Sequence, residues 1–193
     1  NIAYLERIFE TMDEPIEVGD AIDAKDLPTL TGEVDFEHVN FGYEEGQTVL
    51  KDLSLHVRPG ERIALVGPTG AGKSTVVNLL CRFYNLRGGK ITLKCEDGSE
   101  QDISQVTLES LRSQLGIMLQ DSFIFSGTIL SNIRYGKLDA TDEEVITAAK
   151  AVCAHEFIDQ MPQRYQTPVN ERGSGLSQGQ KQLIAFARTL LSD

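Results

Sequence analysis

The chain has 193 residues, of which 40% are hydrophobic and 24% charged, and its formal net charge is -11 at pH 7. This length and composition are typical of one globular domain with a short extension, and they exclude disorder as the default. The negative charge argues against binding to the phosphate backbone of nucleic acid, which needs clustered Lys and Arg. Because no run of 18 apolar residues and no signal-peptide pattern is present, we expect the chain itself to be soluble.

The cysteines point to a reducing environment. Cys81, Cys95 and Cys153 are odd in number and widely spaced, and they form no CxxC or Cys/His pairing. Neither a disulfide framework nor a zinc site is therefore expected.

The first forty residues predict a helix, a linker and then strands. Apolar residues recur at helical spacing over Ile2–Met12, and an acidic, irregular stretch follows until about Gly32. Beyond Glu33, apolar residues alternate on both sides of a turn at Glu45–Gly46. This pattern predicts an antiparallel hairpin.

The middle of the chain predicts alternating strands and helices. A short apolar run at Arg62–Val66 predicts a strand, and a Gly-rich turn separates it from a predicted helix over Lys73–Phe83. We further predict a strand at Ile91–Leu93, a helix near Leu108–Leu115 and a strand at Ile117–Leu119.

Residues after about 122 are predicted to be mostly helical. Thr141 and Glu144 have the spacing of a capping box before the apolar residues of Val145–Val152. The fold class predicted from these patterns is α/β with an all-helical insertion.

One segment matches the phosphate-binding pattern G-x-x-x-x-G-K-[ST] without a mismatch. It consists of Gly67, Pro68, Thr69, Gly70, Ala71, Gly72, Lys73 and Ser74. The motif follows a predicted strand and opens a predicted helix, as its mechanism requires. Backbone N–H groups would surround the β-phosphate, Lys73 would reach the β- and γ-phosphates, and Ser74 would offer its hydroxyl to Mg²⁺.

The alternative for this segment is a Gly-rich turn with a surface lysine, which the presence of strand, spacing and Ser together disfavours. The motif alone does not separate ATPases from GTPases or small-molecule kinases. The chain has no N-K-x-D motif for guanine, which argues against a GTPase.

A second motif lies near the C-terminal end and opens a predicted helix. It consists of Leu176, Ser177, Gln178, Gly179 and Gln180. Ser177 and Gln180 form an S-x-x-Q capping box, which concentrates backbone N–H groups at one helix N-terminus. By itself the motif is equally consistent with an ordinary capped helix. With the phosphate motif upstream, it resembles the LSGGQ signature of ABC ATPases, with Gln178 in place of the first Gly.

The resemblance implies a P-loop NTPase fold: an ABC-type ATPase core with an antiparallel β subdomain and a helical subdomain. Two such domains pair head to tail in the family, and each ATP lies between the P-loop of one and the signature of the other. Ser177 and Gly179 would then contact the γ-phosphate of ATP bound by the partner.

Three further positions resemble family sites. Tyr43 resembles the aromatic residue that stacks on adenine, although a lone Tyr at a strand end is often half-buried packing. Gln120 resembles the Q-loop glutamine that contacts Mg²⁺, and its alternative is a solvent-facing side chain. Thr75 completes the expected nucleotide-binding set, in which Lys73 and Gln120 take the catalytic roles.

Other segments resemble membrane exporters. Glu171-Arg172-Gly173 resembles a motif thought to contact the transmembrane partner, and Phe125–Ile129 also fits the exporter pattern. The resemblance implies that residues 1–31 are a helix and linker from a preceding membrane domain, and that residues 32–193 are the ATP-binding domain. The domain would then work at the cytoplasmic face of a cell membrane, fused to a transmembrane domain and without nucleic acid.

Family members continue after the signature helix with a strand ending in Asp, a catalytic Glu and a switch His. The resemblance therefore implies a fold that is incomplete at the C-terminus, and we expect this chain alone to bind MgATP with negligible turnover. The complete dimeric protein would hydrolyse ATP to power export. Two alternatives stay open: a non-hydrolysing half of a heterodimeric exporter, and a soluble ABC protein without a role in transport.

Overall fold

A computed structural model describes residues 2–118 and 123–192. The chain divides into two compact units, Asn1–Gln114 and Leu115–Asp193. Each unit is described by itself. The predicted domain boundary after residue 31 stays a prediction.

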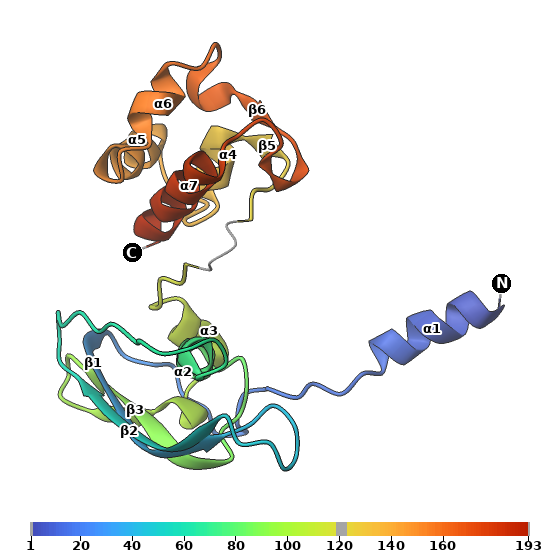
Figure 1. The fold of residues 1–193 in the computed structure, drawn as a ribbon, viewed down its shortest axis with the longest axis vertical. Helices are drawn as coiled ribbons and strands as arrows, with labels where there is room; N and C mark the ends of the chain where they lie inside the picture. The colour runs from blue at the N-terminus through green and yellow to red at the C-terminus, as the bar shows by residue number, and fades with distance from the viewer. Residues whose placement is uncertain (1, 119–122, 193) are drawn as a thin grey trace. The chain divides into compact units, whose positions relative to one another are not determined.

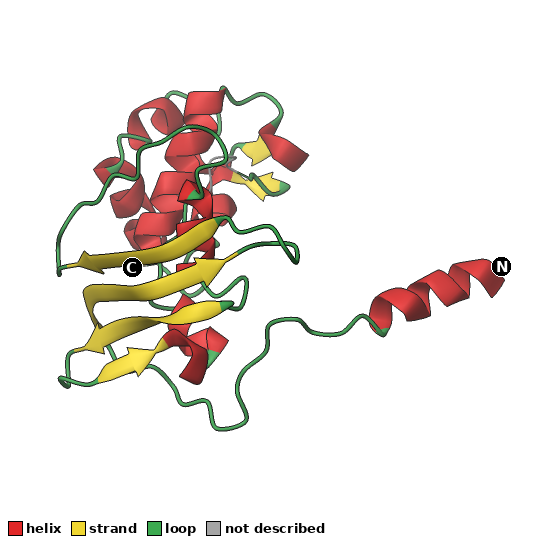
Figure 2. Ribbon diagram, turned by 60° about the horizontal axis from the view of Figure 1, so that its bottom comes forward, coloured by secondary structure: helices red, strands yellow, loops and turns green. Residues whose placement is uncertain are grey.

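The first unit is built around an antiparallel sheet. Its elements are α1 (Ile2–Met12), β1 (Leu30–Phe41), β2 (Leu50–Val57), α2 (Lys73–Leu80), β3 (Gly88–Cys95), β4 (Glu100–Asp102), a 3-10 turn (Ile103–Gln105) and α3 (Leu108–Arg112). The strand order is β2-β1-β3-β4, with every neighbouring pair antiparallel (Figure 2). The predicted hairpin is confirmed, since β1 pairs with β2 and places Phe36 opposite Leu55.

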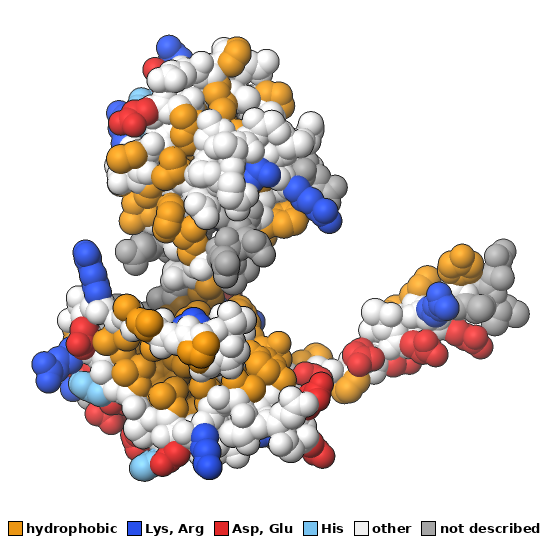
Figure 3. All heavy atoms as spheres, in the orientation of Figure 1, with side chains coloured by type: hydrophobic (Ala, Val, Ile, Leu, Met, Phe, Trp, Pro, Cys, Tyr) orange, Lys and Arg blue, Asp and Glu red, His pale blue; other side chains and the backbone are white. Residues whose placement is uncertain are grey.

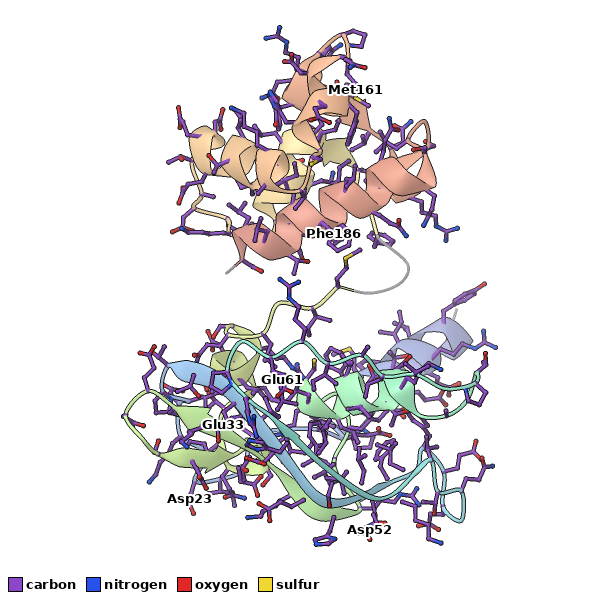
Figure 4. All side chains as sticks on the ribbon, turned by 60° about the vertical axis from the view of Figure 1, so that its left-hand side comes forward. Asp23, Glu33, Asp52, Glu61, Met161 and Phe186 are labelled. Atoms are coloured by element: carbon purple, nitrogen blue, oxygen red, sulfur yellow. The ribbon has the colours of Figure 1, made fainter. Side chains whose placement is uncertain are left out.

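The two faces of this sheet differ because side chains alternate along each strand. Phe36, Ile91 and Leu93 are buried on the inner face. The outer face carries cross-strand ion pairs instead: Lys90 with Glu37 at 2.9 Å and Lys94 with Glu33 at 3.5 Å. Figure 4 labels Glu33 on the sheet. Such pairs leave this face of the sheet polar.

Both helices after the hairpin are shorter than predicted. In Figure 1, α2 and α3 lie on one side of the sheet. The predicted helix over Lys73–Phe83 ends at Leu80, and the predicted helix over Leu108–Leu115 ends at Arg112. Arg82 has a φ of 52°, a conformation that no α-helix tolerates, and this stops α2.

The predicted strand at Arg62–Val66 is wrong. Residues 61–67 form no regular element, and the exposed fractions are 44% for Ile63 and 91% for Val66. A strand needs a neighbour that accepts and donates its backbone hydrogen bonds. Among the described residues, none pairs with this segment.

An apolar groove of about 200 Å³ lies beside this segment. It is lined by β1 and β2 through Val34, Phe36, Leu55 and Val57, by α2 through Val76, Val77 and Leu80, and by Glu61, Ile63 and Leu65. Hydrophobic side chains gather on this unit in Figure 3, and Glu61 is labelled in Figure 4.

The predicted helix at Ile2–Met12 is confirmed as α1, but the segment after it is more ordered than a free linker. Residues 17–30, here called the docked linker, are bonded to the rest of the first unit. Arg82, buried in the turn after α2, donates to the carbonyl of Gly19 at 2.7 Å and to those of Ile103 and Val106 at 3.0 and 2.7 Å. Its burial lowers the pKa of the Arg82 guanidinium.

Side chains of α3 and the residues beside it hold the far end of the docked linker. The hydroxyl of Ser110 accepts from Leu27 N at 2.8 Å, and Gln114 Oε1 accepts from Leu30 N at 2.9 Å. These bonds give backbone N–H groups of the docked linker side-chain acceptors within the first unit.

The second unit is mostly helical. Its elements are β5 (Gly127–Thr128), α4 (Ile129–Arg134), α5 (Asp142–Ala151), α6 (His155–Asp159), a 3-10 turn (Arg164–Gln166), β6 (Pro168–Val169), a 3-10 turn (Glu171–Gly173) and α7 (Gln178–Leu191). The predicted all-helical insertion is wrong, because β5 and β6 pair as a short antiparallel sheet. The predicted capping box of Thr141 and Glu144 is confirmed, with both bonds present. The predicted strand at Ile117–Leu119 is wrong for its described residues, 117 and 118, which are not in a strand.

Apolar side chains and one half-buried arginine hold this unit together. Ile129, Ile133, Val145 and Ile184 are fully buried in one cluster. Arg188 on α7 donates to the carbonyls of Asn132 and Phe123 at 2.8 and 3.0 Å, and to Asn132 Oδ1 at 3.1 Å. Burial lowers the pKa of the Arg188 guanidinium.

Within residues 2–118 and 123–192, every helix is too short or too polar to cross a bilayer.

Candidate functional site

The backbone of residues 67–74 curls at two glycines. Gly70 and Gly72 both have a φ of 85°, in the left-handed region that favours glycine. A Cβ at Gly72 would lie only 2.6 Å from Leu50 Cδ2 of the neighbouring strand. Gly72 is therefore required both for the turn and for close packing of the turn against β2.

The start of α2 offers backbone donors. Gly72 is the N-cap residue, and a glycine has no side chain that could cap the helix. The first helical bond runs from Val76 N to the carbonyl of Gly72 at 3.1 Å. In the described part of the chain, the N–H groups of Lys73, Ser74 and Thr75 therefore have no helical acceptor, and they carry the partial positive charge of the helix end.

Lys73 lies over the loop that precedes it. Its Nζ donates to the carbonyls of Gly67 and Pro68, both at 2.8 Å. An ammonium group has three donors, so one remains for an anion in addition to these two bonds. Ser74 is exposed and follows Lys73 in the chain. Its hydroxyl can serve as a hard oxygen ligand for Mg²⁺.

Tyr43 meets the same helix from the loop after β1. Its hydroxyl is 3.0 Å from Thr75 Oγ1 and accepts from Asn78 Nδ2 at 3.4 Å. The ring is 48% exposed, whereas Thr75 is 4% exposed. The structure thus brings Tyr43 beside the phosphate motif, and its role in stacking on adenine stays a prediction. Thr75 is predicted to contact the nucleotide, and in the structure its hydroxyl is hydrogen-bonded to the hydroxyl of Tyr43.

The signature motif opens α7 in the second unit. Ser177 Oγ accepts from Gln180 N at 3.2 Å, and Gln180 Oε1 accepts from Ser177 N at 2.9 Å. The predicted capping box is confirmed. Gly179 faces open space, since a Cβ there would meet nothing within 4 Å. Leu176 packs against the apolar cluster, while Gln178 is exposed.

The turn before the signature is strained. Arg172 has a φ of 62° and donates its N–H to the carbonyl of Ile124 at 3.1 Å. A Cβ at Gly173 would lie 3.2 Å from Ile124 and 3.2 Å from Lys181 Cε. This segment, predicted to contact a membrane domain, holds the start of α7 against the rest of the second unit.

The predicted sites fall into the two units as follows. Gly67–Thr75 and Tyr43 lie together in the first unit, and Leu176–Gln180 lies in the second. Gln120 is outside the described residues. Analysis of the sequence missed Asn78 and Tyr84, which surround Tyr43. In the sequence, Asn78 lies within the helix that the phosphate motif opens, and Tyr84 lies just after that helix. This proximity was the only sequence signal for either residue.

Comparison with known proteins decides the family. Residues 50–193 match the family model described as "ABC transporter". The chain belongs to the ABC transporter family. The resemblance and the fold class predicted from the sequence are confirmed.

Similar proteins are longer than this chain. The chain is 52% identical to an uncharacterized ABC transporter ATP-binding protein, YfiC, of Bacillus subtilis, and the match covers 100% of the chain and 31% of YfiC. It is 47% identical to a fatty acid ABC transporter ATP-binding/permease protein of Mycobacterium bovis, covering 99% of the chain and 29% of that protein. The chain thus spans less than a third of the length of either relative.

A solved structure supports the same assignment. A bacterial Atm1-family ABC exporter with ATP bound matches with a TM-score of 0.91 and 45% identity. The match covers 100% of this chain and 33% of that chain.

Proposed function

We propose that the chain is the ATP-binding domain of a membrane exporter, and that the complete dimeric protein hydrolyses ATP to power export across a membrane. The geometry of Gly67–Thr75 carries this proposal: left-handed glycines, unpaired N–H groups at the start of α2, and Lys73 Nζ over the loop. The ABC family membership and the likeness to an exporter bound to ATP support it.

The phosphate motif would hold the nucleotide by local charge. The N–H groups of Lys73, Ser74 and Thr75 would donate to phosphate oxygens at a helix N-terminus. Lys73 Nζ would turn its remaining donor to the β- and γ-phosphates. Ser74 would hold Mg²⁺, which supplies charge neutralisation for the phosphates when bound. Gln120 would be a second contact to Mg²⁺.

The second unit would complete the site of another copy or a paralogue. Ser177 and Gly179 would present the N-terminus of α7 to the γ-phosphate held by the partner's P-loop. We propose that Glu171–Gly173 contacts the transmembrane domain at the cytoplasmic face of the membrane. Residues 1–31 would connect that membrane domain to the ATP-binding domain.

The test is calorimetric titration of MgATP into the protein and into two lysine variants. Lys73→Met removes a cation that makes charged hydrogen bonds, so ATP affinity should fall about 10- to 100-fold. Lys51→Met is the matched control, because Lys51 is exposed on β2 and makes no ion pair with the described residues. Equal affinity of all three proteins for MgATP would contradict the proposal.

A further inference from the structure

Three aromatic rings meet next to the phosphate motif. Tyr43 lies with its ring centroid 5.0 Å from that of Phe41 and 5.0 Å from that of Tyr84, at an interplanar angle of 86° in both pairs. Phe41 and Tyr84 are themselves 5.7 Å apart. The two pairs that include Tyr43 have the edge-to-face arrangement that aromatic pairs prefer.

The hydroxyl of Tyr43 alone cannot fix the orientation of its ring. That hydroxyl is bonded to Thr75 and Asn78, which anchors the far end of the side chain to α2. The hydroxyl oxygen and Cβ both lie on the axis of the χ2 rotation. Because χ2 of tyrosine has broad wells, the plane of the ring must be fixed by atoms that touch its faces or edges.

Phe41 at the end of β1 and Tyr84 in the turn after α2 supply those contacts. Phe41 is 4% exposed at the end of β1, so its ring is fixed by the core. Tyr84 is 37% exposed and follows α2. Its position depends on the backbone of the turn that carries it.

Hydrogen bonds on both sides of Tyr84 hold this turn. Phe83 N donates to the carbonyl of Asn78 at 2.9 Å. Asn85 Nδ2 donates to the carbonyl of Glu17 at 3.0 Å, and Arg87 N donates to that of Asn40 at 3.1 Å. Throughout the described residues, the Tyr84 hydroxyl makes no hydrogen bond, so Tyr84 acts on Tyr43 through its ring.

We propose that Tyr84 is a positioning residue that fixes the plane of the Tyr43 ring for stacking on the purine base. This inference rests on the proposed function, because it requires that the phosphate motif hold a nucleotide beside Tyr43. Tyr84 would contribute to recognition of the base and not of the phosphates.

The experiment separates base from phosphate. The whole protein and its Tyr84→Leu and Tyr84→Phe variants are titrated calorimetrically with the ATP analogue AMP-PNP and with tripolyphosphate, each with Mg²⁺. Tyr84→Leu removes the ring edge but keeps an apolar side chain, so AMP-PNP should bind about two- to ten-fold more weakly while tripolyphosphate affinity is unchanged. Tyr84→Phe keeps the ring and should leave both affinities unchanged.

Several outcomes would overturn the inference. If Tyr84→Leu weakens both ligands equally, or binds neither, then Tyr84 acts on the fold and not on the base. If Tyr84→Leu changes neither affinity, the ring contact has no role. A wild-type protein that binds tripolyphosphate as tightly as AMP-PNP would show that the base is not contacted. Failure of the wild-type protein to bind either ligand would instead contradict the proposed function.

Discussion

At the scale of single residues, the phosphate motif depends on Gly72 having no side chain. The left-handed φ disfavours most side chains, and an ideal Cβ at Gly72 would lie 2.6 Å from Leu50 Cδ2, so a methyl group there would force the Leu50 side chain to shift. Backbone donors can therefore point at an anion without a side chain in the way. Gly72 is required for a steric reason, because it has no side chain, whereas Lys73 is required for its positive charge.

We predict that Gly72→Ala destabilises the protein and abolishes most ATP binding. A left-handed alanine costs roughly 1–2 kcal/mol, and the clash with Leu50 adds about 1–3 kcal/mol. Gly98→Ala is the matched control, since Gly98 has a φ of 83° but a Cβ there would meet nothing within 4 Å.

Urea unfolding and calorimetric titration with MgATP would compare these two variants. Gly98→Ala should lose only the backbone cost and keep its ATP affinity. A Gly72→Ala protein that binds ATP like the Gly98→Ala protein would contradict the steric account.

At the scale of elements, three described helices of the second unit start with a complete capping box, and α4 is one of them, with Thr128 as its N-cap residue. Both α5 and α7 have complete capping boxes, with Thr141 and Ser177 as the N-cap residues. Only the second belongs to the signature. The pair allows the structural effect of a cap to be separated from a role in nucleotide binding.

We predict that Ser177→Ala and Thr141→Ala each destabilise the protein by about 1 kcal/mol, because each leaves a helix N–H without its acceptor. Only Ser177→Ala should weaken pairing of two ATP-loaded copies. Chemical unfolding would measure the first effect, and sedimentation with and without MgATP the second. Equal pairing by the two variants would count against the proposed role of the signature.

Elements specified by neighbouring residues were predictable from the sequence. The β1–β2 hairpin and the capping boxes of α5 and α7 follow from patterns a few residues long, and all three are present. The phosphate motif is likewise continuous, and the helix predicted to open at its end is present as α2, which begins at Lys73.

Features that depend on distant partners were not predictable. The segment Arg62–Val66 has the apolar pattern of a strand but pairs with none of the described strands. Tyr84 and Arg82 received no role, because nothing local to the turn after α2 signals a contact with Tyr43 or with Gly19. Long-range packing decides these positions.

At the scale of the whole molecule, the formal net charge of -11 opposes the binding of an anion such as ATP. The long-range field is screened beyond about 8 Å at physiological ionic strength. The proposed binding of the phosphates would therefore rely on short-range donors, namely Lys73 and the N–H groups at the start of α2.

The most direct test of the central claim, that residues 67–74 bind MgATP, is thermal unfolding of the protein and of Lys73→Met with and without MgATP. Ligand at 100 times its Kd should stabilise the wild-type protein by about 2.7 kcal/mol and raise its transition, while the transition of Lys73→Met should move far less. A clean wild-type transition that is indifferent to MgATP would contradict the claim.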